Sequence, residues 1–297
     1  MDWVREGRDW PHHRHSRFVG SGGSRWHVQQ WPAPSAQAPQ LLLLHGTGAS
    51  THSWHRLVPL LARRAGVLAV DLPGHGFSEA ARGEGATLRG MAHGVAALLR
   101  ELGVRPTLLI GHSAGAAIAV QMALDQPQGL QAVVSLNGAL LPLHGLAGQL
   151  FSPLAKLLAA NRFVPHLFAW RAADPARVRR LVDGTGSHID DAGVALYGRL
   201  VRDPAHVAGA LAMMANWDLA ALQRDLPRLQ PRPVHLLVGA HDGTVPPEQA
   251  DKVAARHPNV QLHPLDGLGH LAHEEAPERV AAVLRPLLGR VSRTSHD

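Results

Sequence analysis

Short apolar runs recur along the chain, and the segments between them carry apolar residues at helical spacing. Continuous apolar runs of strand length, typical of parallel strands buried on both faces, occur at residues 41–45, 67–72, 107–112, 131–138 and 234–240. Two further strands are predicted at 26–31, where apolar and polar residues alternate, and at 260–265. Helices are predicted at 88–102, 114–125 and 276–288. This alternation predicts an α/β fold whose mostly parallel central sheet is covered by helices on both faces.

The alternation stops between residues 140 and 222, where helical segments follow one another without a clear strand. We interpret this interval as a helical cap inserted between two strands of the sheet, with apolar faces that line a pocket. The predicted organisation is an N-terminal tail at 1–20, a core at 21–139 and 223–292, and a cap at 140–222.

Composition narrows the classes of function. The chain has 297 residues, of which 45% are hydrophobic, which suffices for a large buried core. It has no cysteine, which excludes disulfides, thiolate metal sites and cysteine nucleophiles. The net charge of +6 comes almost entirely from scattered arginines, so binding to nucleic acid is not expected. The first residues lack the apolar segment of a secretory signal, which favours a cytoplasmic location.

The 21 histidines suggest a metal site, but their sequence context does not support one. The HHRH sequence at 12–15 is either a metal-binding tract or, as we favour, part of a solvated tail. The HLAHE sequence at 270–274 matches neither zinc motif, HExxH or HxxEH. The GSGG sequence at 20–23 lacks the Lys-Ser/Thr of a phosphate-binding loop. We therefore expect no metal, cofactor or nucleotide.

One serine stands in a setting that marks a nucleophile. Residues 111–117 are GHSAGAA, a G-x-S-x-G at the junction between a predicted strand and a predicted helix. Such a turn strains the serine, and larger residues in place of Gly111 and Gly115 would collide with neighbouring backbone. The helix that follows adds positive potential near the serine oxygen. Ser113 is therefore the candidate nucleophile.

A serine hydroxyl needs a base, and the base needs a carboxylate that orients it. Asp242 follows a predicted strand, and His270 lies in a loop after the predicted last strand. Both lie at carboxyl ends of strands, where open α/β sheets place their sites. His273 is the alternative base, nearer the following helix, and Asp266 is an alternative acid close in sequence to His270. We favour Ser113, Asp242 and His270 as a catalytic triad.

A tetrahedral intermediate needs hydrogen-bond donors for its oxyanion. The backbone N–H of Ala114 is one, and we expect the second at Thr47 in the HGTGAS loop at 45–50. In the DLPGHGFS turn, Asp71 and His75 are expected to tie loops together without catalysing. The substrate pocket is expected to contain His45, Gly46, His112, Leu140, Phe151, Trp170, Met213, Met214 and Trp217.

The segments HGTG, DLPGHGFS and GHSAG, with the Asp242/His270 pair, resemble the α/β-hydrolase fold over residues 20–290. A narrower resemblance also includes the cap. The sequences LLLLHGTGASTHSW, GHSAGAAIA, SLNGALLP, GQLFSPLAKLLA, FAWRAADP, DGTGS and MMANWDL are similar to the magnesium-chelatase accessory proteins of bacteriochlorophyll biosynthesis in phototrophic bacteria. This resemblance implies a place in magnesium insertion into protoporphyrin IX or in the handling of pigment intermediates.

Three hypotheses follow. The chain is a serine hydrolase that cleaves an ester of a bulky apolar substrate, for which a tetrapyrrole ester is a candidate. Alternatively, it is a non-catalytic protein that binds a tetrapyrrole or assists magnesium chelatase on a hydrolase scaffold. A weak contact with a membrane surface is the third, because residues 126–155 carry no charge. Prolines and polar residues interrupt that stretch, so it is not expected to span a membrane.

Overall fold

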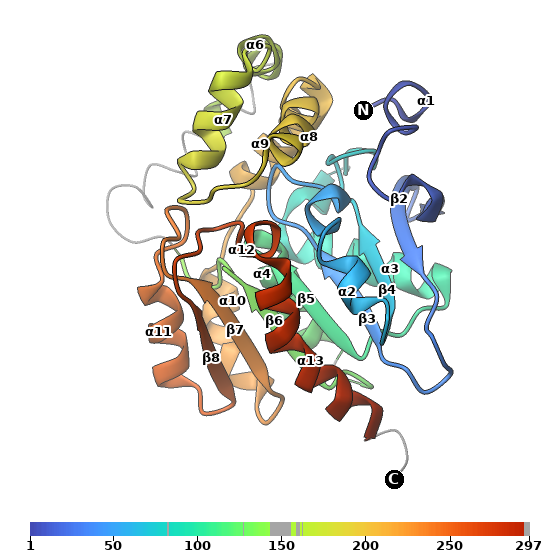
Figure 1. Cartoon of the computed structure of the whole chain (residues 1–297), viewed down its shortest axis with the longest axis vertical. Helices are drawn as coiled ribbons and strands as arrows, with labels where there is room; N and C mark the ends of the chain where they lie inside the picture. Colours follow the sequence, from blue (N-terminus) through green and yellow to red (C-terminus); the bar gives the residue numbers. More distant parts are fainter. Residues whose placement is uncertain (82, 127, 143–155, 159–160, 162, 294–297) are drawn as a thin grey trace.

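Eight strands form one sheet in the order β1-β2-β4-β3-β5-β6-β7-β8 (Figure 1). The computed structural model describes residues 1–81, 83–126, 128–142, 156–158, 161 and 163–293. The strands are β1 (Ser16–Ser21), β2 (Ser24–Trp31), β3 (Gln40–Leu44), β4 (Gly66–Val70), β5 (Leu108–His112), β6 (Ala132–Leu136), β7 (Val234–Gly239) and β8 (Val260–Leu265).

The strand pattern predicted from the sequence is confirmed, because every expected strand is present as one of β2 to β8. Strands β4, β3, β5, β6, β7 and β8 run parallel, whereas β2 is antiparallel to β4 and to β1. Strands β3, β4, β5, β6 and β7 are buried along almost their whole length, as the continuous apolar runs require. Their carboxyl ends therefore meet at one edge of the sheet.

Helices cover both faces of the sheet. Those described are α1 (Trp3–Glu6), α2 (Val58–Leu61), α3 (Leu88–Leu102), α4 (Ala114–Asp125), α6 (Val164–Arg171), α7 (Pro175–Asp183), α8 (Asp191–Val201), α9 (Pro204–Ala215), α10 (Ala220–Asp225), α11 (Glu248–Arg256), α12 (Ala272–Glu275) and α13 (Pro277–Arg293). The predicted bounds of α3 and α4 are confirmed, while α13 extends beyond the predicted end at residue 288.

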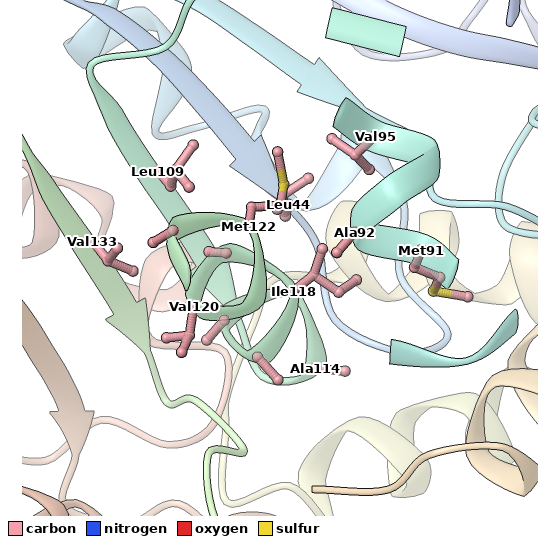
Figure 2. Packing of buried hydrophobic residues seen from close by; sticks show 14 of the residues in the cluster. Leu44, Met91, Ala92, Val95, Leu109, Ala114, Ile118, Val120, Met122 and Val133 are labelled. Atoms are coloured by element: carbon pink, nitrogen blue, oxygen red, sulfur yellow. The ribbon is translucent and has the colours of Figure 1, made fainter. Parts of the chain in front are cut away.

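Two hydrophobic layers hold these helices to the sheet. Helices α3 and α4 pack on one face, and α2 and α13 pack on the other. Figure 2 shows α4 against Leu109 of β5 and Val133 of β6, with Met91 and Val95 of α3 alongside. Helix α3 is capped by Thr87, whose hydroxyl accepts a hydrogen bond from Gly90 N at 3.0 Å, and at its other end by Gly103 with φ 64°.

The interval between β6 and β7 contains α6 to α9, which stand above the carboxyl ends of the strands (Figure 1). Helices α7 and α8 share a small core with Leu271 of the main fold, built on Val178, Val182 and Val194. The boundaries of the cap at residues 140 and 222 stay a prediction. In the described part of the chain, no helix has the length and apolar character needed to cross a membrane.

The N-terminal segment differs from the predicted tail at 1–20. Strand β1 pairs with β2 along its whole length, and Trp10 is only 1% exposed. The HHRH sequence is attached as well, because the His12 and His15 rings bond to the backbone oxygens of His55 and Gln30. The prediction of a solvated tail was therefore wrong for this segment. Charged residues beside Trp10 in the sequence suggested a solvated segment, although the large apolar ring of tryptophan favours burial.

Candidate active site

Ser113 lies between β5 and α4 with φ 52° and ψ −118°, an uncommon conformation for a residue with a side chain. The neighbouring glycines allow the turn to close. A Cβ on Gly111 would lie 2.3 Å from the Gly115 carbonyl oxygen, and a Cβ on Gly115 would lie 2.1 Å from that of Leu44. Both distances are far below contact distance, so the steric role predicted for these glycines is confirmed.

Asp242 and His270 form a buried pair at the ends of β7 and β8. His270 Nδ1 donates to Asp242 Oδ2 at 2.8 Å, and the other oxygen, Oδ1, accepts from Thr244 N and Val245 N. Because Nδ1 carries the proton, the neutral ring leaves Nε2 as its basic nitrogen. His112, next to Ser113, donates from Nε2 to the His270 carbonyl oxygen at 2.9 Å. This bond ties the loop of His270 to the serine turn.

Asn137 is a partner of this pair that the sequence did not reveal. It follows β6, has φ 46°, and is 1% exposed. Its Nδ2 donates to Asp242 Oδ2 at 2.8 Å, the oxygen that also accepts from His270. Asn137 therefore fixes the carboxylate from the neighbouring strand. The only sequence signal is an asparagine directly after an apolar run, which local patterns do not distinguish from a turn residue.

The alternative acid and base have other surroundings. His273 is fully buried, and neither ring nitrogen has a hydrogen-bond partner in the described part of the chain. Burial, with His270 and His55 nearby, lowers the pKa of His273 to about 3. Asp266 is exposed, and its backbone oxygen accepts from Arg279. The structure thus brings His270, and not His273, together with Asp242.

Two backbone N–H groups are available beside Ser113. Neither Ala114 N nor Thr47 N donates to an acceptor within the described residues. Gly46 lies close to the serine, since a Cβ on Gly46 would be 3.0 Å from Ser113 Cβ. The Thr47 hydroxyl donates to Met213 Sδ of α9 at 3.3 Å, so it is already engaged by the cap.

His45 and Asp71 hold the loop at 45–50 in place through hydrogen bonds. His45 is fully buried: its Nδ1 donates to Gly46 O at 2.8 Å, and its Nε2 accepts from Leu72 N at 2.9 Å. Burial lowers the pKa of His45, so the ring stays neutral. Asp71 accepts from Thr51 N, Phe77 N and His27 Nδ1, the tie between loops that we predicted. His45 therefore supports the loop and does not line the pocket in which we expected it.

A segment of the cap joins the loops of Asp242 and His270. The Thr185 carbonyl oxygen accepts from Gly243 N at 2.9 Å and from His270 N at 3.3 Å. The Ser187 hydroxyl accepts from Leu271 N at 2.7 Å. Residues 185–187, here called the seam segment, therefore hold both loops in place. The sequence marked DGTGS as a family feature but gave no sign of this contact.

Helix α9 makes a second connection between cap and core. His206 accepts a hydrogen bond from Gly76 N at its Nδ1 and donates from Nε2 to Gly48 O, both at 3.0 Å. Burial lowers the pKa of His206 to about 4, so the ring is neutral, as this pairing requires. Beside it, a Cβ on Gly209 would lie 2.1 Å from Gly74 O, which brings the two backbones into direct contact.

The family model described as the alpha/beta hydrolase fold matches residues 39–277. The chain belongs to the α/β-hydrolase fold family. The "Magnesium-chelatase 30 kDa subunit" of Rhodobacter capsulatus is 42% identical over 259 residues, which cover 87% of this chain and 89% of that protein. This match confirms the narrower resemblance.

More distant relatives of this α/β-hydrolase fold protein carry other names. A pimeloyl-[acyl-carrier protein] methyl ester esterase of Methylococcus capsulatus is 28% identical, over 86% of this chain and 96% of its own. A thermophilic esterase from Thermogutta terrifontis has a similar structure, with a TM-score of 0.73 and 24% identity over 93% of this chain and 99% of its own. The structural likeness supports the fold alone.

The predicted pocket residues of this α/β-hydrolase fold protein fall into different places. Met213 is buried against Thr47, while Met214 and Trp217 are half-buried. His112 and Leu140 are buried, Phe151 lies outside the described residues, and Trp170 is 71% exposed on α6. Trp170 therefore does not line a pocket at Ser113 in this structure.

Other candidate sites lie away from the serine. A cavity of about 620 Å³ opens between the carboxyl-terminal ends of α3 and α4, beside the loop that precedes β5. It is therefore at the amino ends of the strands, on the opposite side from Ser113. Among the described residues, no group of three His, Asp or Glu side chains is arranged to hold a metal ion.

Proposed function

We propose that this protein is a serine hydrolase that cleaves an ester of a bulky apolar substrate. One observation carries the proposal: the strained Ser113 lies beside a loop whose His270 is oriented by Asp242 through a 2.8 Å hydrogen bond. Orientation of a histidine by a buried carboxylate, next to a serine on a strand-to-helix turn, is the arrangement that activates a hydroxyl.

In the proposed reaction, Ser113 Oγ attacks the ester carbonyl carbon while His270 Nε2 takes the serine proton. The N–H groups of Ala114 and Thr47 stabilise the oxyanion. The C–O bond then breaks, and the alcohol leaves with the proton from His270. Water attacks the acyl-serine, gives a proton to His270, and releases the acid as that proton returns to Ser113.

An active-site probe tests this proposal directly. A fluorophosphonate should form one adduct, at Ser113, in the folded protein, and Ser113→Ala should abolish it. Asp242→Asn should slow labelling by roughly 10³-fold or more, because the wrong histidine tautomer is then favoured. The exposed Ser35→Ala is the matched control and should label like the wild type. No adduct at Ser113 in folded protein would refute the proposal.

We propose further that the protein acts in bacteriochlorophyll biosynthesis, in association with magnesium chelatase, on a tetrapyrrole ester. The name of the Rhodobacter capsulatus relative supports this placement. The same name favours a second candidate, a non-catalytic tetrapyrrole-binding or chelatase-assisting protein. Complementation of a deletion strain separates the two candidates. Wild-type pigment levels restored by Ser113→Ala would refute the hydrolase and favour the non-catalytic protein. The cytoplasmic location stays a prediction.

A further inference from the structure

Helix α6 is packed with its large apolar side chains outward. Leu167 and Trp170 of α6 are 50% and 71% exposed, and Phe163, the residue before its first turn, is 66% exposed. Their spacing of four and three residues places them in one stripe. The face turned toward the protein carries smaller residues, Pro165 and Ala169, which are buried. A helix that stabilised only its own fold would bury the larger side chains.

This stripe is part of a concentration of exposed apolar side chains in the cap. Of the large apolar residues that the structure describes as exposed, all but Val4 lie between Leu157 and Leu181. Exposed apolar side chains that share one face of a helix mark an interaction site. Helix α6 projects at one end of the molecule, beyond the other cap helices (Figure 1).

Positive charge accompanies the stripe. Arg171 ends α6 directly after Trp170, while Lys156 precedes α6 in the sequence and Arg180 lies on α7. In the part of the chain that the structure describes, these three cations have no carboxylate partner, whereas Arg177 pairs with Asp174 at 3.3 Å. Helix α6 itself has no acidic residue. Helix α6 therefore combines an apolar stripe with a cation at its end, which suits an anionic partner with an apolar interior.

We propose that α6 docks the protein on an anionic lipid bilayer, with Phe163, Leu167 and Trp170 in the acyl boundary and Arg171 at the lipid phosphates. A helix of eight residues is about 12 Å long, which suits shallow burial parallel to the surface. Tryptophan at the edge of the stripe suits the interface, where its ring is partly apolar and its N–H remains hydrated. A projecting helix can enter a bilayer without movement of the core.

Vesicle sedimentation of the full chain tests the docking. Wild-type protein should sediment with vesicles of phosphatidylglycerol and phosphatidylcholine, and much less with phosphatidylcholine alone or at high salt. The triple variant Phe163→Ser/Leu167→Ser/Trp170→Ser should lower the partition coefficient roughly 10-fold or more. Arg171→Ser should lower it about 5-fold. Val4→Ser, which removes an exposed apolar residue on α1, is the matched control and should bind like the wild type.

A labelling experiment keeps the test independent of how well the triple variant folds. The chain has no cysteine, so Leu167→Cys can carry a single polarity-sensitive dye. Its emission should shift to the blue on anionic vesicles, whereas the same dye on Val4→Cys should not respond.

Several results would overturn the proposal. They are wild-type protein that stays in the supernatant, equal binding by the triple variant, and a dye at residue 167 that senses no change. If the wild-type protein is a dimer that binds no vesicles, and the triple variant is a monomer, the stripe is instead a contact between two copies of the chain. Fluorophosphonate labelling of Ser113 is measured without vesicles, so these results would overturn the docking proposal and leave the proposed hydrolase function untouched.

Discussion

Asp242 is held by residues that no local motif marks. The sequence marks Ser113, Asp242 and His270 as candidates, because each follows a strand within a recognisable turn. Asn137 could not be predicted to join them, because its hydrogen bond to Asp242 links residues 105 positions apart. Such a contact depends on which strands are neighbours, and the pairing of β6 with β7 is a property of the folded sheet.

Asn137→Ala should slow the reaction of Ser113 with a fluorophosphonate roughly 10-fold, because a hydrogen bond to a charged carboxylate is lost. Asp242 would then be free to rotate away from His270, so the pH profile of the labelling rate should shift as well. The measurement is the second-order labelling rate from pH 5 to 9.

Asn216→Ala is the matched control, because the Asn216 side chain bonds only locally to Ala212 O in the described structure. It should leave both rate and profile unchanged. A wild-type rate and profile for Asn137→Ala would show that Asp242 needs no support from β6.

At the scale of elements, the seam segment connects the cap to the loops of Asp242 and His270. The sequence predicted a helical insertion between two strands, but helical periodicity carries no information on which backbone groups of the cap meet the core. Gly186 shows what was missing: its φ is 77°, and a Cβ there would lie 1.8 Å from His241 O. The loops of Asp242 and His270 close around a residue that has no side chain.

Gly186→Ala should therefore force the seam segment away from the loop of Asp242. We expect a loss of labelling at Ser113 of roughly 100-fold, comparable to a displacement of about 1 Å in a catalytic group. The control is Gly184→Ala, two residues away, where φ is −61° and alanine is allowed. Equal labelling of the two variants, both folded by circular dichroism, would contradict the importance of this contact.

Another link between cap and core is sensitive to pH. Tyr197 of α8 donates to Glu274 Oε1 of α12 at 2.7 Å, and burial raises the pKa of Glu274 to about 8. The folded state keeps this proton while the unfolded chain, with a pKa near 4.5, loses it. The contribution of Glu274 to stability therefore falls as pH rises from about 4.5 to about 8.

Glu274→Gln keeps the acceptor for Tyr197 and removes the titration. The variant should gain thermal stability over the wild type as pH rises from 5 to 8, by an amount on the order of a few kcal/mol at pH 8. Thermal unfolding at several pH values measures the difference. Glu278→Gln, at an exposed position, is the control, and a pH-independent difference for Glu274→Gln would contradict a buried neutral Glu274.

At the scale of the whole molecule, the sequence predicted the sheet and its layers but not the histidine-rich interior. Histidine counts alone do not distinguish ligands, tails and buried rings. Several of the buried rings here tie loops together through their nitrogens, as His45 and His206 do. Fully buried histidines whose pKa is lowered, with burial as the largest cause, are His45, His52, His75, His112, His206 and His273.

This interior should make the protein labile to acid. A histidine with a lowered folded pKa stays neutral in the folded state, whereas the unfolded chain takes up a proton below pH 6.5. The five whose pKa is lowered most, His52, His75, His112, His206 and His273, should each cost about 1 kcal/mol of stability on going from pH 7.5 to 5.5. Their sum outweighs the opposite effect of Glu274. Calorimetry should show a lower unfolding midpoint at pH 5.5, with net proton uptake on unfolding. An unchanged midpoint would refute the neutral interior.

The contacts of α9 with the loop of Thr47 have a consequence for turnover. Met213 contacts the Thr47 hydroxyl and His206 bonds to Gly48 O, so α9 is joined directly to the loop of Thr47, the residue proposed as an oxyanion donor. If Ser113 reacts as proposed, swinging α9 outward to admit a large molecule also withdraws that donor. The protein would then alternate between an open, unreactive form and a closed, reactive form. Only a molecule enclosed by the closed cap would be attacked by Ser113.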